Sequence, residues 1–166
     1  MTILYLLVCY PGGNTYFRPH HDSGRLSEDG SQVQLNRDEH GAARIATVFV
    51  YLSTHSADEG GATRFNRLGG GGGVKVQPKA GSAAVWSNVD KAGAPDVDVV
   101  HEAESLSSAR MVSMGEALQD RRIPLKMGLN LWFTDVPNYP RPEVLVSANS
   151  ETAHEKMHIY AAHDIH

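Results

Sequence analysis

Short apolar runs separated by glycine and proline turns dominate this sequence and limit what it can fold into. The strongest runs cover residues 3–10, 45–52 and 126–133, and shorter ones cover 74–76 and 83–86. They are rich in β-branched and aromatic residues, and little helical periodicity separates them. This pattern predicts an all-β protein, a sandwich or a jelly-roll barrel, with few short helices.

The segments between these runs carry weaker signals. We expect a short strand over residues 97–101 and an extended segment over 15–22, where Pro19 favours the edge of a sheet. Residues 23–43 are polar without an apolar pattern, which predicts a long loop beside the opening of a site. Residues 107–119 have the one passable helical spacing in the chain.

Length and composition are those of an ordinary globular domain. The chain has 166 residues, of which 41% are hydrophobic and 20% charged, enough for one domain with its own core. A net charge of −4 without a basic block argues against a nucleic-acid partner. The apolar opening run lacks the flanks of a secretory signal and no stretch could span a membrane, so we expect a cytoplasmic protein by default. The single cysteine excludes an internal disulfide.

The histidine content points to a metal site. Nine histidines are many for this length, and a His-x-Asp triplet stands at His20 and Asp22. Side chains two positions apart on an extended segment share a face, so these two face one way and His21 points away. His101, which follows an apolar run, supplies a second imidazole. Two imidazoles and one carboxylate form the facial ligand set of iron(II) oxygenases, which leaves coordination positions open.

Other interpretations of these residues remain open from the triplet alone. A His-x-Asp triplet is common and is more often a polar pair on an exposed strand, and His101 by itself would more often be a satisfied core histidine. If the site holds iron, the retained carboxylate of Asp22 favours hydroxylation over halogenation, because fewer coordination positions stay open. The remaining histidines of the polar tail lack a framework to converge and are expected at the surface: His154, His158, His163 and His166.

Between Tyr10 and Phe133, several motifs in order resemble those of the Fe(II)/2-oxoglutarate dioxygenases of the prolyl 4-hydroxylase type. Each motif is weak alone, and their shared order is what makes the resemblance specific. They occupy residues 9–13, 19–22, 44–53, 60–65, 78–88, 101–103 and 126–133.

The resemblance implies a double-stranded β-helix (jelly-roll) in which His20, Asp22 and His101 hold iron(II) and form the catalytic centre. It implies 2-oxoglutarate and O2 as cosubstrates, with ascorbate as an optional addition, and release of succinate and CO2. The family's default substrate is a prolyl residue of a peptide or protein. A free amino acid or other small molecule is the alternative, as are a cupin-like metalloenzyme that does not use 2-oxoglutarate and a non-catalytic binding domain.

The resemblance also implies a cation for the far carboxylate of 2-oxoglutarate. Lys126 is our candidate, because it opens a strand and stands at the family's spacing before Trp132. It follows His101 by 25 positions, a longer gap than is usual in the family. Arg110 is therefore a rival, although it lies in an apparent insertion over residues 105–122.

Two tyrosines match residues that contact the cosubstrate in relatives. Tyr10 and Tyr51 are implied to hydrogen-bond 2-oxoglutarate, and a structural role in the core is the alternative for each. We expect the dioxygenase domain to cover residues 1–137 and a C-terminal extension to cover 138–166. A strand starting almost at Met1 suggests that an N-terminal portion common in such domains is missing or very short. The oligomeric state cannot be predicted from this sequence.

Overall fold

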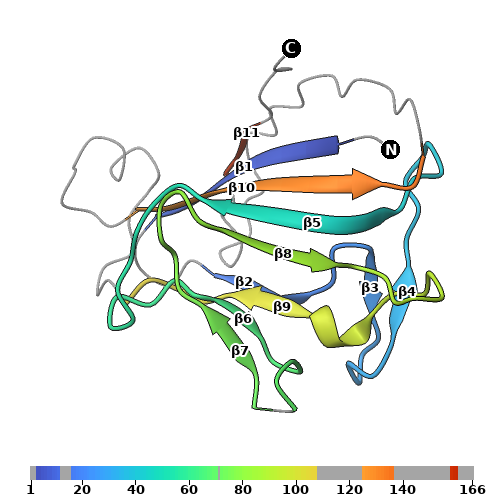
Figure 1. The fold of residues 1–166 in the computed structure, drawn as a ribbon, viewed down its shortest axis with the longest axis horizontal. Helices are drawn as coiled ribbons and strands as arrows, with labels where there is room; N and C mark the ends of the chain where they lie inside the picture. The colour runs from blue at the N-terminus through green and yellow to red at the C-terminus, as the bar shows by residue number, and fades with distance from the viewer. Residues whose placement is uncertain (1–2, 12–15, 71, 108–124, 137–157, 161–166) are drawn as a thin grey trace.

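Two antiparallel β-sheets face each other and enclose the core (Figure 1). The computed structural model describes residues 3–11, 16–70, 72–107, 125–136 and 158–160. The first sheet has the strand order β11-β1-β10-β5-β8 and the second the order β2-β9-β6-β7. This arrangement confirms the predicted all-β jelly-roll.

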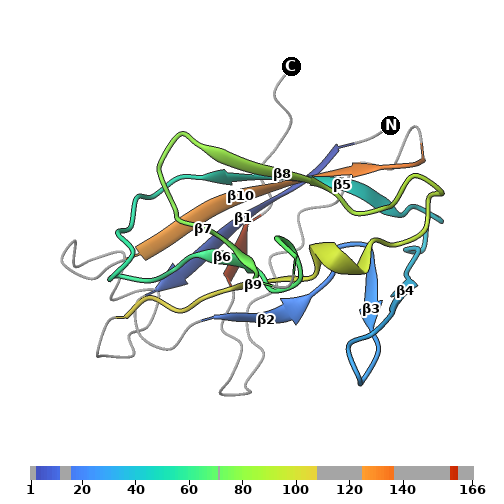
Figure 2. The same cartoon turned by 60° about the horizontal axis from the view of Figure 1, so that its bottom comes forward.

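The bounds of the strands follow the apolar runs closely. The first sheet consists of β1 (Ile3–Pro11), β5 (Arg44–Tyr51), β8 (Ala83–Ser87), β10 (Leu125–Thr134) and β11 (His158–Tyr160). The second sheet consists of β2 (Phe17–His20), β6 (Thr63–Phe65), β7 (Val74–Val76) and β9 (His101–Ala103). Figure 2 shows the second sheet lying beneath the first, with β2 along one edge. The edge position of β2 agrees with the proline at position 19.

The core lies between the sheets and is built by strand alternation. On β5, the side chains of Thr47, Phe49 and Tyr51 are buried, whereas those between them are half-buried. Phe49 packs across Gly128 of β10, because a Cβ atom at that glycine would stand inside the Phe49 ring. Phe65 of β6 closes the core from the opposite sheet. Every second side chain of the central strands thus points into the space between the sheets.

The segment 23–43 is not the featureless loop that its polarity predicted. It contains a short hairpin of β3 (Gly24–Leu26) and β4 (Val33–Leu35), in which Gly24 is the register partner of Leu35. The turn between the strands is held by Asp29, whose carboxylate accepts bonds from the Ser27 and Ser31 hydroxyls. Strands of three residues are too short to show an alternating pattern, which explains why the prediction failed.

The predicted strand over residues 97–101 is also wrong. Residues Val97–Val99 form a turn of 3-10 helix, η1, and the strand β9 begins only at His101. The Asp96 side chain accepts a bond from the Asp98 amide and so caps this turn. An apolar valine run has strand propensity, but this local cap overrides it.

Several sequence-based expectations fall outside the described residues. The expected helix over residues 107–119 lies almost wholly there, and so does the extension over 138–166 apart from β11. That strand pairs with β1 through three register partners, and the boundary between domain and extension stays a prediction. Within the described part of the chain, no helix has the length and hydropathy needed to cross a bilayer.

Candidate metal centre and ligand cavity

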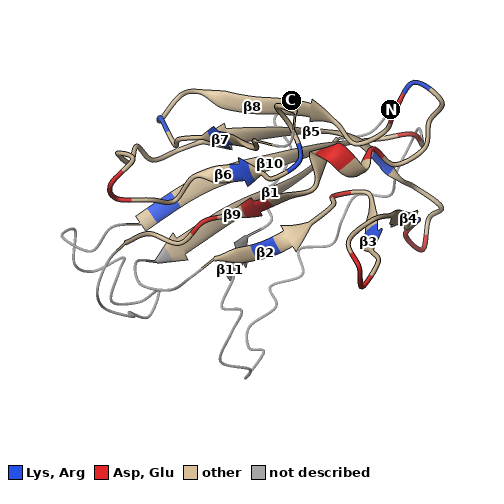
Figure 3. Ribbon diagram, turned by 90° about the horizontal axis from the view of Figure 1, so that it is seen from below, with Lys and Arg blue, Asp and Glu red and all other residues tan. Residues whose placement is uncertain are grey.

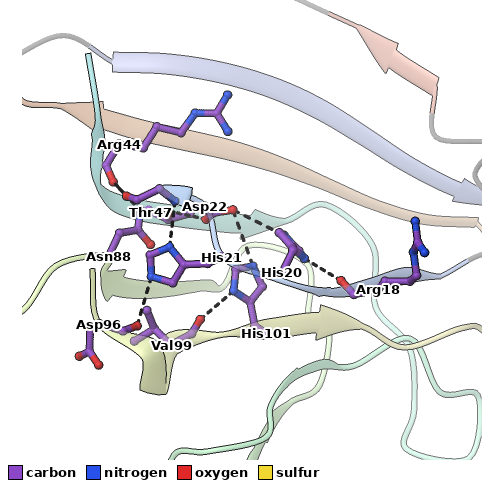
Figure 4. A network of polar contacts seen from close by, with 11 residues as sticks. Arg18, His20, His21, Asp22, Arg44, Thr47, Asn88, Asp96, Val99 and His101 are labelled. Carbon is purple, nitrogen blue, oxygen red and sulfur yellow. Dashed lines mark hydrogen bonds and ion pairs between the residues drawn. The ribbon is translucent and has the colours of Figure 1, made fainter. Parts of the chain in front are cut away.

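His20, Asp22 and His101 converge on one point between the sheets. β2 and β9 are neighbours, and His20 and His101 are register partners across them. Asp22 stands in the turn just after β2, with Oδ1 3.5 Å from His20 Nε2 and 3.9 Å from His101 Nε2. Among the described residues these three form the one cluster with metal-ligand geometry, their ligand atoms lying within 4.8 Å of one another. Figure 4 shows the three side chains pointing toward each other.

Backbone carbonyls fix which nitrogen each imidazole turns toward the centre. His20 Nδ1 lies 2.9 Å from the Arg18 carbonyl and His101 Nδ1 lies 3.0 Å from the Val99 carbonyl. A carbonyl only accepts, so each Nδ1 carries the hydrogen and each neutral ring presents the lone pair of Nε2. Burial lowers the pKa of His101 to about 4, which keeps this ring neutral near pH 7. Neutral imidazoles with a fixed tautomer are suitable metal ligands.

The Asp22 carboxylate is buried but remains ionised. Burial alone would raise its pKa, but the adjacent His20 and His101 rings and the hydrogen bond from Thr47 hold the pKa of Asp22 below its usual range. Thr47 Oγ1 donates to Oδ2 at 2.6 Å, while Oδ1 faces the two imidazoles. One carboxylate oxygen is therefore engaged by the protein and the other faces the candidate metal position.

His21 is buried and serves a different purpose from its neighbours. Its Nε2 donates to the Asp96 carbonyl at 3.1 Å, and its Nδ1 accepts a bond of 3.1 Å from the Ser23 amide. The ring points away from the triad (Figure 4). It thereby ties the turn that carries Asp22 to the residue that caps η1, just before His101. This side chain thus adds a second link, beside the pairing of β2 with β9, between the segments that carry Asp22 and His101.

A cavity of about 260 Å³ opens between the sheets beside the triad. Its walls are largely aromatic, from Phe49, Trp86 and Trp132, and Trp86 packs edge-on against the His101 ring with centroids 4.8 Å apart. The side chains of Asp22 and His101 are 5% and 8% exposed, whereas that of His20 is 30% exposed. The triad is therefore reached from solvent on the His20 side, at the edge strand β2.

Lys126 also borders the cavity. It is fully buried, and its Nζ has no hydrogen-bond partner among the described residues. Nζ lies 5.1 Å from the centre of the Tyr10 ring. Burial lowers the pKa of Lys126 to about 8, although Glu104 opposes this. A buried ammonium without a partner is costly, so this residue is suited to bind an anion that enters the cavity.

The two predicted tyrosines lie differently. Tyr10 borders the cavity beneath Lys126. Tyr51 is fully buried outside the lining, and its hydroxyl donates to Thr63 Oγ1 at 2.9 Å. Thr63 lines the cavity, so Tyr51 reaches it only through this bond. Arg110 falls outside the described residues, and the cosubstrate roles of Lys126 and both tyrosines stay predictions.

Sequence reasoning missed the residues that support Asp22. Thr47 and Asn88 lie within the motif segments 44–53 and 78–88, but the motifs assign neither of them a role. Asn88 is fully buried, and its Nδ2 donates to Thr47 Oγ1 at 2.9 Å and to the Arg44 carbonyl at 3.1 Å. Alternation along β5 places Thr47 on the same face as Tyr51, a signal that could have found it. The Arg44 guanidinium lies 3.8 Å over the Trp132 ring, a contact with no sequence signal.

Comparison with known proteins agrees with this geometry. Residues 5–134 match the model of the 2OG-Fe(II) oxygenase superfamily, whereas no curated protein matches. The fold is similar to the viral collagen prolyl hydroxylase of Paramecium Bursaria Chlorella virus-1 in its 2OG complex, with a TM-score of 0.55 and 21% identity. It is also similar to a prolyl-4-hydroxylase of Pseudomonas putida, with a TM-score of 0.50 and 21% identity.

These two matches cover 82% and 84% of this chain, and 62% and 56% of the solved structures. The chain thus spans about three fifths of the length of the proteins whose fold it shares.

Proposed function

The chain belongs to the 2OG-Fe(II) oxygenase superfamily, and from this premise we propose that it is an iron(II)- and 2-oxoglutarate-dependent hydroxylase of prolyl residues in a peptide or protein. The observation that carries the proposal is Lys126, a buried ammonium without a partner among the described residues, in the same cavity as the His-Asp-His triad. A candidate metal ligand set and an anion-binding group in one cavity suit a cosubstrate that is both a metal chelator and a dianion.

The residues of the triad fit iron(II) by their chemistry. His20 and His101 would each offer Nε2, and Asp22 would offer Oδ1, which gives the two-histidine, one-carboxylate set. When bound, iron would supply an oxidative decarboxylation in which one oxygen atom of O2 enters succinate, CO2 leaves 2-oxoglutarate, and the other oxygen atom hydroxylates an unactivated C–H bond. The protein supplies tautomers, orientation and an aromatic wall that limits water.

Lys126 would bind the far carboxylate of 2-oxoglutarate. Below its pKa of about 8 the ammonium is charged, and a charge-assisted bond in a dry cavity is strong. Tyr10 packs against the lysine and holds one wall of the same space. The lysine therefore sets both the depth and the direction in which the cosubstrate enters.

The substrate is proposed from likeness and from access. The two similar structures are described as prolyl hydroxylases, one of them of collagen. In this chain the exposed ligand is His20, on the edge strand β2, so a substrate would approach the metal along an open sheet edge. An extended peptide suits an open edge better than a closed small-molecule pocket.

Succinate release is the test of this proposal. Iron-loaded protein would be assayed with 2-oxoglutarate against proline-containing peptides and free amino acids, with Lys126→Met as the matched variant. We expect succinate with peptides, little with free amino acids, and a loss of turnover in Lys126→Met. Release with free amino acids alone would move the substrate class to small molecules. Iron-loaded protein that forms no succinate with either set, or turnover unchanged in Lys126→Met, would reject the cosubstrate assignment.

A further inference from the structure

We propose that Asn88 and Thr47 form a directional hydrogen-bond relay that restricts Asp22 to one metal-binding oxygen. The inference rests on the proposed metal centre and assigns positioning residues to it. Both residues are fully buried, and they lie on neighbouring elements of the first sheet, Thr47 in β5 and Asn88 just after β8. Figure 4 shows both residues on the side of Asp22 opposite His20.

The direction of the relay begins at a backbone carbonyl. The Arg44 carbonyl lies 3.1 Å from the Asn88 amide and can only accept a hydrogen bond. This fixes the amide with Nδ2 toward Arg44, since the flipped orientation would place two oxygens against each other. The second hydrogen of Nδ2 then points to Thr47 Oγ1 at 2.9 Å. The amide oxygen is left buried without a partner among the described residues, an arrangement that a purely structural asparagine would avoid.

The next step follows from the single hydrogen of a hydroxyl. Thr47 Oγ1 accepts from Asn88, so its own hydrogen is free for one acceptor, and Asp22 Oδ2 stands 2.6 Å away. A bond of this length to a carboxylate is short and strong. The Arg44 carbonyl, the Asn88 amide and the Thr47 hydroxyl thus act in series, and each is set by the one before it.

The consequence at Asp22 concerns how many oxygens reach a metal. Oδ2 is occupied by Thr47, and only Oδ1 faces the Nε2 atoms of His20 and His101. A carboxylate that binds through one oxygen takes one coordination position, and the position it leaves open is available to cosubstrate or O2. Thr47 and Asn88 therefore act on the metal through Asp22 and touch neither cosubstrate nor substrate.

Titration with Co(II), an oxygen-stable stand-in for iron(II), tests the relay without turnover. Thr47→Val removes the donor at nearly constant volume, and Thr47→Ser keeps it. Asn88→Asp would hold its proton toward the Arg44 carbonyl and offer an oxygen to Thr47, which reverses the relay and turns the Thr47 hydrogen away from Asp22. Thr134→Val, a buried threonine of β10 outside the cavity lining, controls for the loss of a buried hydroxyl.

We expect Co(II) affinity to fall by about 10- to 100-fold in Thr47→Val, the usual effect of losing a partner of a metal ligand. Co(II) affinity should also fall in Asn88→Asp, while Thr47→Ser and Thr134→Val should bind Co(II) as tightly as wild type. Unchanged or tighter binding in Thr47→Val or Asn88→Asp would overturn the relay. If Thr47→Val does not fold, as thermal unfolding without metal would reveal, Asn88→Asp and Thr47→Ser decide the question. Wild-type protein that fails to bind Co(II) would instead reject the metal centre itself.

Discussion

The two ends of the cavity treat their polar groups in opposite ways. At the triad, the atoms of the three side chains that face away from the centre have partners: the Nδ1 atoms bond to backbone carbonyls, and Asp22 Oδ2 accepts from Thr47. At the other end, the Lys126 ammonium is buried with no hydrogen-bond partner among the described residues. The side chains of the triad are oriented before any ligand binds. Lys126, in contrast, gains a partner only when an anionic ligand binds.

This difference separates two ways of building a binding site. Orientation of metal ligands needs rigidity, because a metal tolerates little error in the direction of its donors. Capture of a dianion needs an unbalanced charge, which lowers the stability of the empty protein. We therefore expect substitutions at the triad to affect metal binding, and substitutions at Lys126 to affect cosubstrate binding and stability in opposite directions.

The largest expected effect is loss of the metal in His101→Ala. Removal of a ligand should weaken Co(II) or iron(II) binding by more than about 100-fold, since loss of a ligand's partner alone costs up to that much. Titration monitored by calorimetry measures it. The matched control is His55→Ala, since His55 is also buried but bonds to Ser53 and the Leu125 carbonyl outside the triad. Equal metal binding by the two variants would show that His101 is not a metal ligand.

Lys126→Met should come next, with an effect confined to the cosubstrate. Breaking a buried charge pair costs about 3–5 kcal/mol, so 2-oxoglutarate should bind the metal-loaded variant at least about 100-fold more weakly. Metal affinity should stay at the wild-type value. Lys75→Met, at an exposed lysine of β7, is the control. Unchanged 2-oxoglutarate affinity in Lys126→Met would return Arg110 as the candidate cation.

The same lysine predicts a pH dependence of the ligand-free protein. Burial lowers the pKa of Lys126 from 10.5 to about 8, so between these values the unfolded chain binds more protons than the folded one. The free energy of unfolding should therefore rise with pH across this window, by at most about 3 kcal/mol. Below pH 8 the penalty is fully present, and Lys126→Met should be more stable than wild type there.

Denaturant titrations of wild type and Lys126→Met at pH 7 and pH 10, without metal or 2-oxoglutarate, measure this effect. The comparison between the two proteins cancels other groups that titrate in the same range, such as Cys9. Stability differences that are equal at both pH values would show that the lysine is not strained when the cavity is empty.

Gly128→Ala should disturb the wall between the two ends. An added Cβ atom would enter the Phe49 ring, and overpacking of a filled core costs about 1–3 kcal/mol. We expect a lower denaturation midpoint and weaker 2-oxoglutarate binding, because Phe49 lines the cavity. Triad geometry should be spared, so Co(II) affinity should change little. A strong loss of Co(II) binding would mean that the two ends are not independent.

The smallest effect is expected at the charged residues on the strands of the second sheet (Figure 3). Arg64 Nε lies 4.0 Å from Glu102 Oε1, and Arg64 Nη1 lies 3.9 Å from Glu104 Oε1. The Arg64 side chain is 44% exposed. Exposed pairs of this kind contribute about 0–1 kcal/mol. Arg64→Ala should change the free energy of unfolding by less than about 1 kcal/mol. Metal binding and 2-oxoglutarate binding should stay at their wild-type values. A change in the affinity for metal or for 2-oxoglutarate would show that the binding site extends beyond the cavity to Arg64.

The sequence was sufficient for the long strands. The three residues predicted as metal ligands also lie together in the structure, and their metal role stays a prediction. Predicted strands over 3–10, 45–52 and 126–133 agree with β1, β5 and β10 to within one residue at each end, because long apolar runs have few alternatives. The failures at 23–43 and 97–101 involve three-residue elements, which are determined by side-chain caps.

The support of Asp22 could not be predicted because it depends on register. Thr47 and Asn88 are 41 positions apart, and they meet only because β8 lies beside β5. The backbone amide of Asn88, just after β8, donates to the Ile45 carbonyl and holds Asn88 beside β5. Strand order and register are set by the whole sheet, so local patterns do not report them. The cavity around Lys126 depends in the same way on the pairing of β1 with β10.

The register pair His20 and His101 also bears on how the protein opens. β2 is an edge strand with two register partners on β9, and one of these two pairs is His20 with His101. A metal bound across this pair would hold the edge strand β2 to β9, and at a hundredfold excess over its dissociation constant it would add about 2.7 kcal/mol to stability. We therefore expect amide hydrogen exchange in β2 to slow on metal loading more than in β5 or β10. Metal supply would then control the lifetime of the folded edge as well as the chemistry beside it.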